Sequence, residues 1–147
     1  MILTFCGHTQ FLKTVECEHK IVALLSEKIG DAPADIFLGG YGNFDFFAYD
    51  CCKKYKETHP NINLVLVTPY ISDNYLKQQG KKYDLILYPE IGDKPKRYAI
   101  VYRNRFMIEK ADFVIAYVSH NWGGAYTMYR YGKRMGKMIY NLADFKE

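Results

Sequence analysis

The sequence lacks the features that mark several large classes of protein. None of its apolar runs is long enough to cross a membrane, so we expect no membrane partner. Its first residues already form a short strand-like run, not a basic segment followed by a long apolar one, so we expect no signal peptide. Together these absences predict a cytoplasmic protein.

Paired cysteine motifs are also missing. The four cysteines contain no Cys-x-x-Cys, and Cys51 and Cys52 are adjacent, which is awkward for a disulfide framework. Cys17 and His19 match no standard zinc spacing with the other cysteines. We therefore expect reduced thiols, no metal ion and no cofactor.

The dinucleotide fingerprint Gly-x-Gly-x-x-Gly does not occur, and neither sign of charge dominates. The 20 Lys and Arg residues slightly outnumber the 16 Asp and Glu residues, which gives a net charge of +4. This mildly basic balance suits an anionic ligand but is too weak by itself to indicate a nucleic-acid partner.

What the sequence does contain is one globular domain. Its 147 residues, 49% of them hydrophobic, can form one core but are too few for two comfortable ones, so we expect a single domain over residues 1–147. The aromatic fraction of 16% is high because there are 14 Tyr and 9 Phe residues. Tyrosines can stack on bases, although most are expected to pack half-buried with a hydrated hydroxyl.

Apolar runs alternate with helical patterns along the whole chain. This alternation predicts an α/β, Rossmann-like three-layer sandwich with a mostly parallel sheet of about six strands and right-handed crossovers. Helical spacing is expected over residues 15–29, 44–55, 73–79, 95–111 and 125–136. The expected strands are residues 2–5, 35–38, 63–67, 84–88, 113–118 and 138–141.

Glycine-bearing loops follow the first, second and fifth expected strands. A strand, a glycine loop and a helix present backbone N–H groups and a helix N-terminus to an anion, usually a phosphate; the alternative is an ordinary turn in which glycines only relieve crowding. The three loops can share one ligand only if their strands are neighbours. A strand order of 4-3-2-1-5-6 achieves this, with the crevice between strands one and five.

Several polar residues near these loops allow more than one interpretation. His8 either contacts the ligand or is a structural hydrogen-bonding residue. Asn43 is a plausible N-cap, and Asp45 lies in the first turn of the helix that follows. Asp45 either complements the helix dipole, binds ribose hydroxyls or acts as an acid or base at a glycosidic centre. Nearby helix N-termini would favour its ionised form.

These motifs, taken together, resemble the YpsA/YoqJ-like branch of the SLOG superfamily, which also includes Smf/DprA and LOG relatives. The resemblance covers nearly the whole chain and implies a Rossmann-like fold that binds nucleotides or nucleotide-derived ligands. Members of this branch are largely without an assigned reaction. The matching motifs are Cys6-Gly7-His8, Gly39-Gly40-x-Gly42-x-Phe44-Asp45, Pro69, Arg103-Asn104 with Met107 and Asp112, and Gly123-Gly124.

The LOG relatives are phosphoribohydrolases, and this chain is similar to them only in part. They have an arginine nine residues before the Asp that opens the strand, as Arg103 precedes Asp112 here. Their strand is followed by Gly-Gly-x-Gly-Thr-x-x-Glu, whereas here Tyr126 replaces a glycine and Arg130 replaces the catalytic glutamate. A cation cannot stabilise an oxocarbenium-like centre or activate water. Among nearby acids only Asp45 is placed to substitute.

Three functions follow from these observations. The favoured one is a module that binds or senses a nucleotide-derived small molecule, because the loops suit phosphate but no convincing acid/base pair accompanies them. The second is an N-glycosidase or phosphoribosyl-transfer enzyme with Asp45 as its acid. The third, suggested by the DprA-like relatives and the tyrosines, is binding of single-stranded nucleic acid.

We also expect a homo-oligomer. The expected ligand site combines the three glycine loops with the arginine and asparagine of the fourth long helix. Its residues are Gly7, His8, Thr9, Gly39, Gly40, Tyr41, Gly42, Asn43, Asp45, Pro69, Arg103, Asn104, Ser119, Asn121, Gly123, Gly124 and Thr127.

Overall fold

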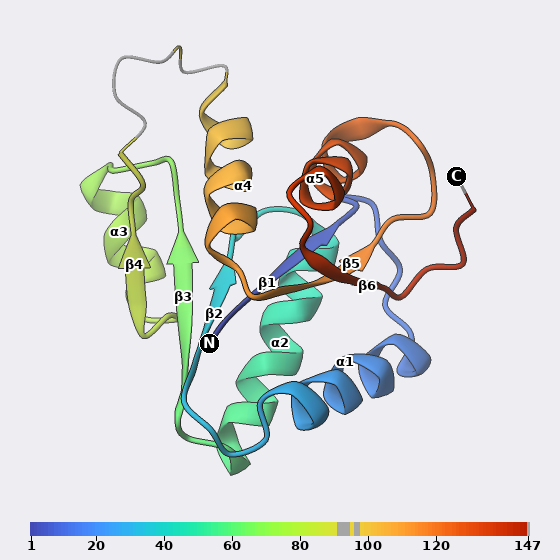
Figure 1. Ribbon diagram of the computed structural model, residues 1–147. Coiled ribbons are helices and arrows are strands. Elements are labelled where there is room, and N and C mark those ends of the chain that lie inside the picture. The colour runs from blue at the N-terminus through green and yellow to red at the C-terminus, as the bar shows by residue number, and fades with distance from the viewer. Residues whose placement is uncertain (91–94, 96–97, 147) are drawn as a thin grey trace.

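A computed structural model describes residues 1–90, 95 and 98–146 (Figure 1). Over these residues strands and helices alternate as the sequence predicts. The strands are β1 (Ile2–Gly7), β2 (Ala34–Leu38), β3 (Ile62–Val67), β4 (Leu85–Leu87), β5 (Phe113–Tyr117) and β6 (Met138–Asn141). The helices are α1 (Val15–Lys28), α2 (Asn43–Thr58), α3 (Asp73–Gln79), α4 (Ala99–Lys110) and α5 (Gly123–Arg134).

All six strands lie in one parallel sheet with the order β4-β3-β2-β1-β5-β6, which confirms the predicted order. The central strand β1 pairs with β2 on one side and with β5 on the other; its last residue, Gly7, lies opposite Tyr117. Strands β2 to β4 extend the sheet on one side of β1, and β5 and β6 extend it on the other. The loops that follow β1 and β5 therefore diverge and leave a crevice at the carboxyl edge.

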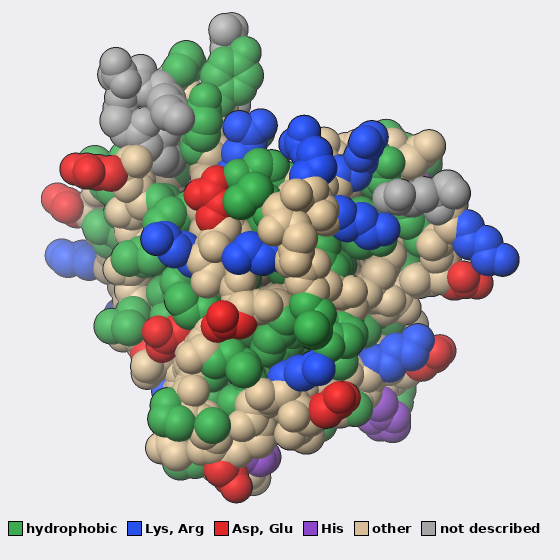
Figure 2. Space-filling view, viewed as in Figure 1, with side chains coloured by type: hydrophobic (Ala, Val, Ile, Leu, Met, Phe, Trp, Pro, Cys, Tyr) green, Lys and Arg blue, Asp and Glu red, His purple; other side chains and the backbone are tan. Residues whose placement is uncertain are grey.

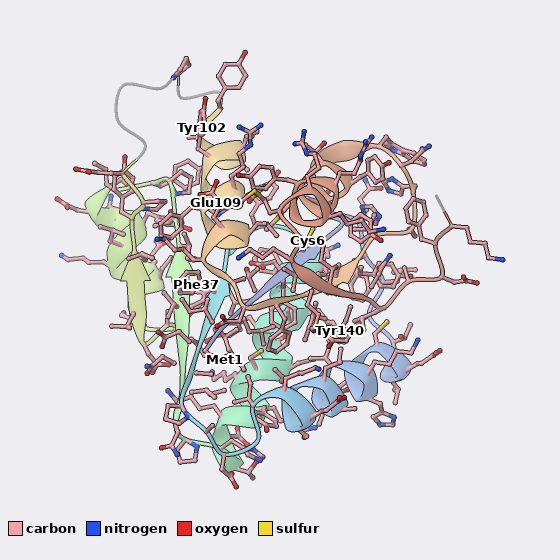
Figure 3. The ribbon with its side chains drawn as sticks, in the orientation of Figure 1. Met1, Cys6, Phe37, Tyr102, Glu109 and Tyr140 are labelled. Atoms are coloured by element: carbon pink, nitrogen blue, oxygen red, sulfur yellow. The ribbon has the colours of Figure 1, made fainter. Side chains whose placement is uncertain are left out.

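Helices cover both faces of the sheet (Figure 1). Alternate side chains of the strands point to opposite faces, so each face has its own apolar cluster. On one face Leu3 and Phe5 of β1 pack with residues of α1 and α2. On the other face Cys6 of β1 packs with residues of α4 and α5, as Figure 3 shows for its position beside α5.

The expected boundaries differ from the structure mainly at helix ends. The fourth long helix begins at Ala99 and not at Pro95; residues 96–97, which the expected helix included, lie outside the described residues. Val15 and Met135 were expected on buried stripes but are exposed, because each lies at a terminus of its helix: Val15 is the first residue of α1, and Met135 is the C-cap of α5. Val22, in the middle of α1, is 37% exposed.

Gly7 is a glycine because α2 crosses directly over the end of β1. A Cβ built on Gly7 would lie 2.1 Å from Cδ2 and 2.3 Å from Cγ of Phe44, whose own side chain is buried. The Phe44 ring also packs near Phe11 and Phe5, so it has little room to move away. Helix α2 can therefore lie this close to the carboxyl edge only because residue 7 is a glycine and has no side chain.

We expect Gly7→Ala to lower the free energy of unfolding by roughly 2–3 kcal/mol, because the added methyl overpacks the contact with Phe44. Gly124→Ala is the matched control, since a Cβ there would meet no atom within 4 Å. Urea unfolding followed by circular dichroism measures both. Equal stabilities for the two variants would contradict this account of Gly7.

Candidate functional site

A cavity of about 590 Å³ lies at the carboxyl edge of the sheet, at the crevice between β1 and β5. The loops after β1, β2 and β5 line it, together with α4 and the start of α5. The prediction that the three glycine loops are neighbours is therefore confirmed. The predicted site residues that line the cavity are Gly7, His8, Thr9, Gly39, Tyr41, Asp45, Arg103, Asn104, Gly123 and Gly124.

The remaining predicted residues do not line this cavity. In the β2–α2 loop, a Cβ on Gly40 would meet Leu66 at 2.9 Å, and one on Gly42 would meet Thr9 at 3.0 Å. Both glycines have positive φ angles, of 68° and 93°, so they serve the path of the loop itself. Asn43 is exposed, and its expected role as N-cap is wrong, because Gly42 is the N-cap and Asn43 is the first residue of α2.

The other predicted residues outside the cavity serve local structure or face solvent. The hydroxyl of Thr127 donates to the carbonyl oxygen of Gly123 within α5, and the backbone N–H of Ser119 donates to His8. Pro69 is half-buried at the end of β3, and Asn121 is exposed.

The N-terminus of α2 is already occupied by the protein. The N–H of Asn43 donates to the carbonyl oxygen of Thr9 at 3.0 Å, and the N–H of Phe44 donates to that of His8 at 3.4 Å. These two amides are among the first-turn donors that have no partner inside a helix. Because the β1–α1 loop accepts from them, this helix end does not offer them to a ligand.

The Asp45 carboxylate turns back onto the glycine loop that precedes it. It accepts hydrogen bonds from the backbone N–H groups of Gly39, at 3.4 Å, Gly40 and Tyr41, at 3.3 Å. Burial raises the pKa of the Asp45 carboxyl above its ordinary value, while these amides and Arg103 act in the opposite direction. The expected preference for the ionised form is therefore opposed by desolvation. The loop behaves as an anion nest filled by the chain's own carboxylate.

Arg103 connects α4 to the same loop. Its side chain is only 4% exposed; Nη1 donates to the carbonyl oxygens of Gly39, at 2.8 Å, and Val67, at 3.1 Å. Nε donates to Oδ1 of Asn104 at 2.9 Å, which supplies the polar partner that an asparagine on this helix face needs. None of the hydrogen bonds between described residues uses Nη2 of Arg103. Arg103 itself lines the cavity.

The N-terminus of α5 opens on the cavity. Its N-cap residue, Trp122, makes no capping hydrogen bond with its side chain, and no acidic residue lies in the first turn. Gly123 and Gly124 line the cavity, and a Cβ on either would meet no atom within 4 Å. The first-turn amides, which have no partner inside the helix, are therefore unobstructed. The positive end of the helix dipole faces the same space.

Three stacked rings form one wall of the cavity. The rings of His8 and His120 lie 3.7 Å apart between centroids, and those of His120 and Trp122 lie 3.6 Å apart. Nε2 of His8 accepts the N–H of Ser119 at 2.9 Å, while the buried Nδ1 of His120 has no hydrogen-bond partner among the residues that the structure describes. His120 and Trp122 were not among the predicted site residues. The one signal that could have identified them is the chain's single tryptophan directly before Gly123.

No nucleophilic or metal-binding chemistry is evident at the site. The Cys6 thiol lines the cavity but donates to the carbonyl oxygen of Ala125, and burial raises its pKa to about 12, so it stays protonated. All four cysteines are buried and free. Within the described part of the chain, no cluster of His, Cys, Asp and Glu side chains could hold a metal ion, and no helix is long and apolar enough to span a bilayer.

Comparison with solved structures identifies a similar fold. The chain resembles DNA processing protein A from Helicobacter pylori, a protein described for its unique mode of binding single-stranded DNA, with a TM-score of 0.66 and 20% sequence identity. The match covers 98% of this chain and 66% of the other, so this chain spans just under two thirds of its neighbour's length. The likeness supports the Rossmann-like fold; the narrower YpsA/YoqJ assignment stays a prediction. No protein-family model and no curated protein matches the sequence.

The buried His8 predicts a pH-dependent stability. Burial, and to a smaller extent His120, lower the pKa of His8 below its ordinary value of 6.5. As the pH falls below 6.5, the unfolded chain takes up a proton at this position before the folded chain does, so the free energy of unfolding decreases. The loss levels off once the pH is below the folded-state pKa.

We expect His8→Asn to remove the part of this pH dependence that His8 causes, because an asparagine can accept the Ser119 N–H but does not titrate. His19→Asn, at an exposed position on α1, is the matched control and should keep the wild-type dependence. Urea unfolding between about pH 7.5 and pH 5 measures the effect. An identical pH dependence in wild type and His8→Asn would show that His8 does not contribute.

Proposed function

We propose that the cavity binds a nucleotide or a nucleotide-derived small molecule, with a phosphate at the N-terminus of α5. The observation that carries this proposal is the uncapped start of α5, where Gly123 and Gly124 open on the cavity beside Arg103. A helix N-terminus with free amides favours an anion, and glycines let it come close to the backbone.

Arg103 strengthens the case for an anionic ligand. Its guanidinium is buried, and its Nη2 group has no hydrogen bond to another described residue. A buried guanidinium with free N–H groups gains from a charge-assisted bond to a phosphate oxygen. The neighbouring Asp45 offsets part of the charge of Arg103, so the open amides of α5 must supply the rest of the attraction for an anion.

The rest of the cavity suits a nucleoside. Its volume of about 590 Å³ falls within the usual range of small-molecule sites, roughly 300–1,000 Å³. Trp122 and Tyr41 both line it and are 65% and 63% exposed, so each presents ring surface on which a base can stack. Because Trp122 is the single tryptophan of the chain, its fluorescence reports directly on occupancy of the site.

We expect Gly124→Val to weaken AMP binding by about 100-fold or more, because the branched side chain would project into the phosphate position. The fold should survive, since a Cβ at Gly124 has open space. Thr127→Val is the control: this residue is exposed one turn further along α5 and does not line the cavity. Calorimetric titration with AMP and Trp122 fluorescence measure both variants. Wild-type affinity in Gly124→Val would move the phosphate elsewhere.

An N-glycosidase activity is the alternative supported by Asp45, which lines the cavity as its acidic residue. Its carboxylate, however, already accepts three backbone hydrogen bonds. Arg130, at the position of the LOG glutamate, is exposed and stacks over the Tyr126 ring. Glycoside hydrolysis usually needs one carboxyl group as the acid and a second as the base or nucleophile, and Asp45 has no such second carboxylate beside it among the residues that line the cavity.

We therefore expect wild-type protein to release no free base from AMP, NAD or nucleosides above the background of buffer alone. Chromatography of overnight incubations measures this. Base release that disappears in Asp45→Asn, while AMP still binds, would make the enzyme the better interpretation.

Single-stranded DNA is a second candidate ligand, favoured by two observations. The solved structure that the chain resembles belongs to a protein that binds single-stranded DNA. Figure 2 shows Lys and Arg side chains gathered over α4 and α5. On these two helices Arg105, Arg130 and Arg134 lie over tyrosine rings. Salt separates the candidates, because affinity for a DNA backbone falls steeply with ionic strength, whereas a single phosphate held inside a cavity loses far less affinity.

A further inference from the structure

Two groups of backbone amides that could cradle a phosphate meet at this cavity, and the chain itself occupies one of them. The first group, at the start of α5, is open. The second is the nest of N–H groups at Gly39, Gly40 and Tyr41, and all three donate to the carboxylate of Asp45. Nests of this kind, formed by successive amides of a glycine loop, commonly hold a phosphate.

We propose that Asp45 is a specificity-determining residue that fills the nest at residues 39–41 and thereby restricts the cavity to ligands with a single phosphate. This inference rests on the proposed function of the site. The carboxylate takes the hydrogen-bond donors, the space and the charge balance that a second phosphate would need. The expected ligand class is thus a nucleoside monophosphate, and pyrophosphate-containing nucleotides are selected against.

The cation at the site fits this restriction. Arg103 has two of its three nitrogens committed: Nη1 donates to the carbonyl oxygens of Gly39 and Val67, and Nε donates to Asn104. The charge of the Asp45 carboxylate already interacts favourably with this guanidinium. A diphosphate would therefore bring additional negative charge next to a carboxylate, with only Nη2 of one arginine to offset it. In a partly buried site this repulsion is weakly screened.

The other helix end near the cavity offers no substitute. The first amides of α2 donate to the carbonyl oxygens of Thr9 and His8. Displacing these carbonyls would detach the β1–α1 loop from α2, so the second phosphate cannot simply move there.

The first experiment needs only the wild-type protein. AMP, ADP, ADP-ribose and adenosine are titrated calorimetrically, and inorganic phosphate and pyrophosphate are used as competitors of AMP. We expect AMP to bind about tenfold or more tightly than ADP and ADP-ribose, and also more tightly than adenosine. Pyrophosphate should compete no better than inorganic phosphate.

The second experiment changes Asp45. Asp45→Ala vacates the nest and should shift the ratio of ADP affinity to AMP affinity towards ADP by about tenfold. Asp45→Asn keeps the size of the side chain and removes its charge, so it should give a smaller shift in the same direction. Asp50→Ala, which removes an exposed carboxylate from the same helix, is the control and should keep the wild-type ratio.

The outcomes separate this inference from the function on which it rests. Equal or tighter binding of ADP or ADP-ribose by wild type overturns the restriction to one phosphate and leaves nucleotide binding intact. An unchanged affinity ratio in folded Asp45→Ala also overturns the role of Asp45. Should that variant fail to fold, the wild-type ratio and Asp45→Asn decide. Binding of none of these nucleotides overturns the proposed function and this inference together.

Discussion

The geometry at the carboxyl edge of this sheet depends on one short segment, the loop from Gly39 to Tyr41. Side chains from two helices hold this loop. Arg103 on α4 binds its carbonyl oxygen at Gly39, and Asp45 on α2 binds its three N–H groups. The loop thereby connects helices that cover opposite faces of the sheet. Each charge-assisted hydrogen bond contributes about 1.5–3 kcal/mol, so replacing either side chain leaves backbone groups of this loop without their partners. Geometry at the cavity is set by this arrangement before any ligand arrives.

This arrangement gives the glycines of the chain different roles. A Cβ on Gly39 would lie 3.0 Å from the Arg103 guanidinium, and one on Gly40 would collide with Leu66. Both glycines make room for contacts within the protein. Gly124, in contrast, faces open space in the cavity. Glycines that follow a strand therefore have two different roles. In the β2–α2 loop they make room for contacts within the protein, and at the start of α5 they leave open space in the cavity.

Most of the fold could be predicted from the sequence, because it depends on local patterns. The apolar runs and helical periodicities identify the elements, and the need for the glycine loops to be neighbours identifies the strand order. The direction of individual side chains could not be predicted. Sequence places Asp45 in the first turn of α2, but only the folded backbone shows that its carboxylate turns back onto the loop. Two other features likewise depend on contacts between loops. The carbonyl oxygens of Thr9 and His8 accept from the first amides of α2, and the ring of His120 stacks on His8.

The two walls of the cavity are supported by different parts of the protein. On one side, β1 and the residue that follows it hold the start of α5: His8 accepts the Ser119 N–H of the loop before the helix, and Cys6 donates to Ala125 in its first turn. On the opposite side, the clamp between α2 and α4 fixes the filled nest. Hydrogen bonds within the protein therefore fix both walls, so the fold itself sets which backbone amides of the cavity are already bound and which are open.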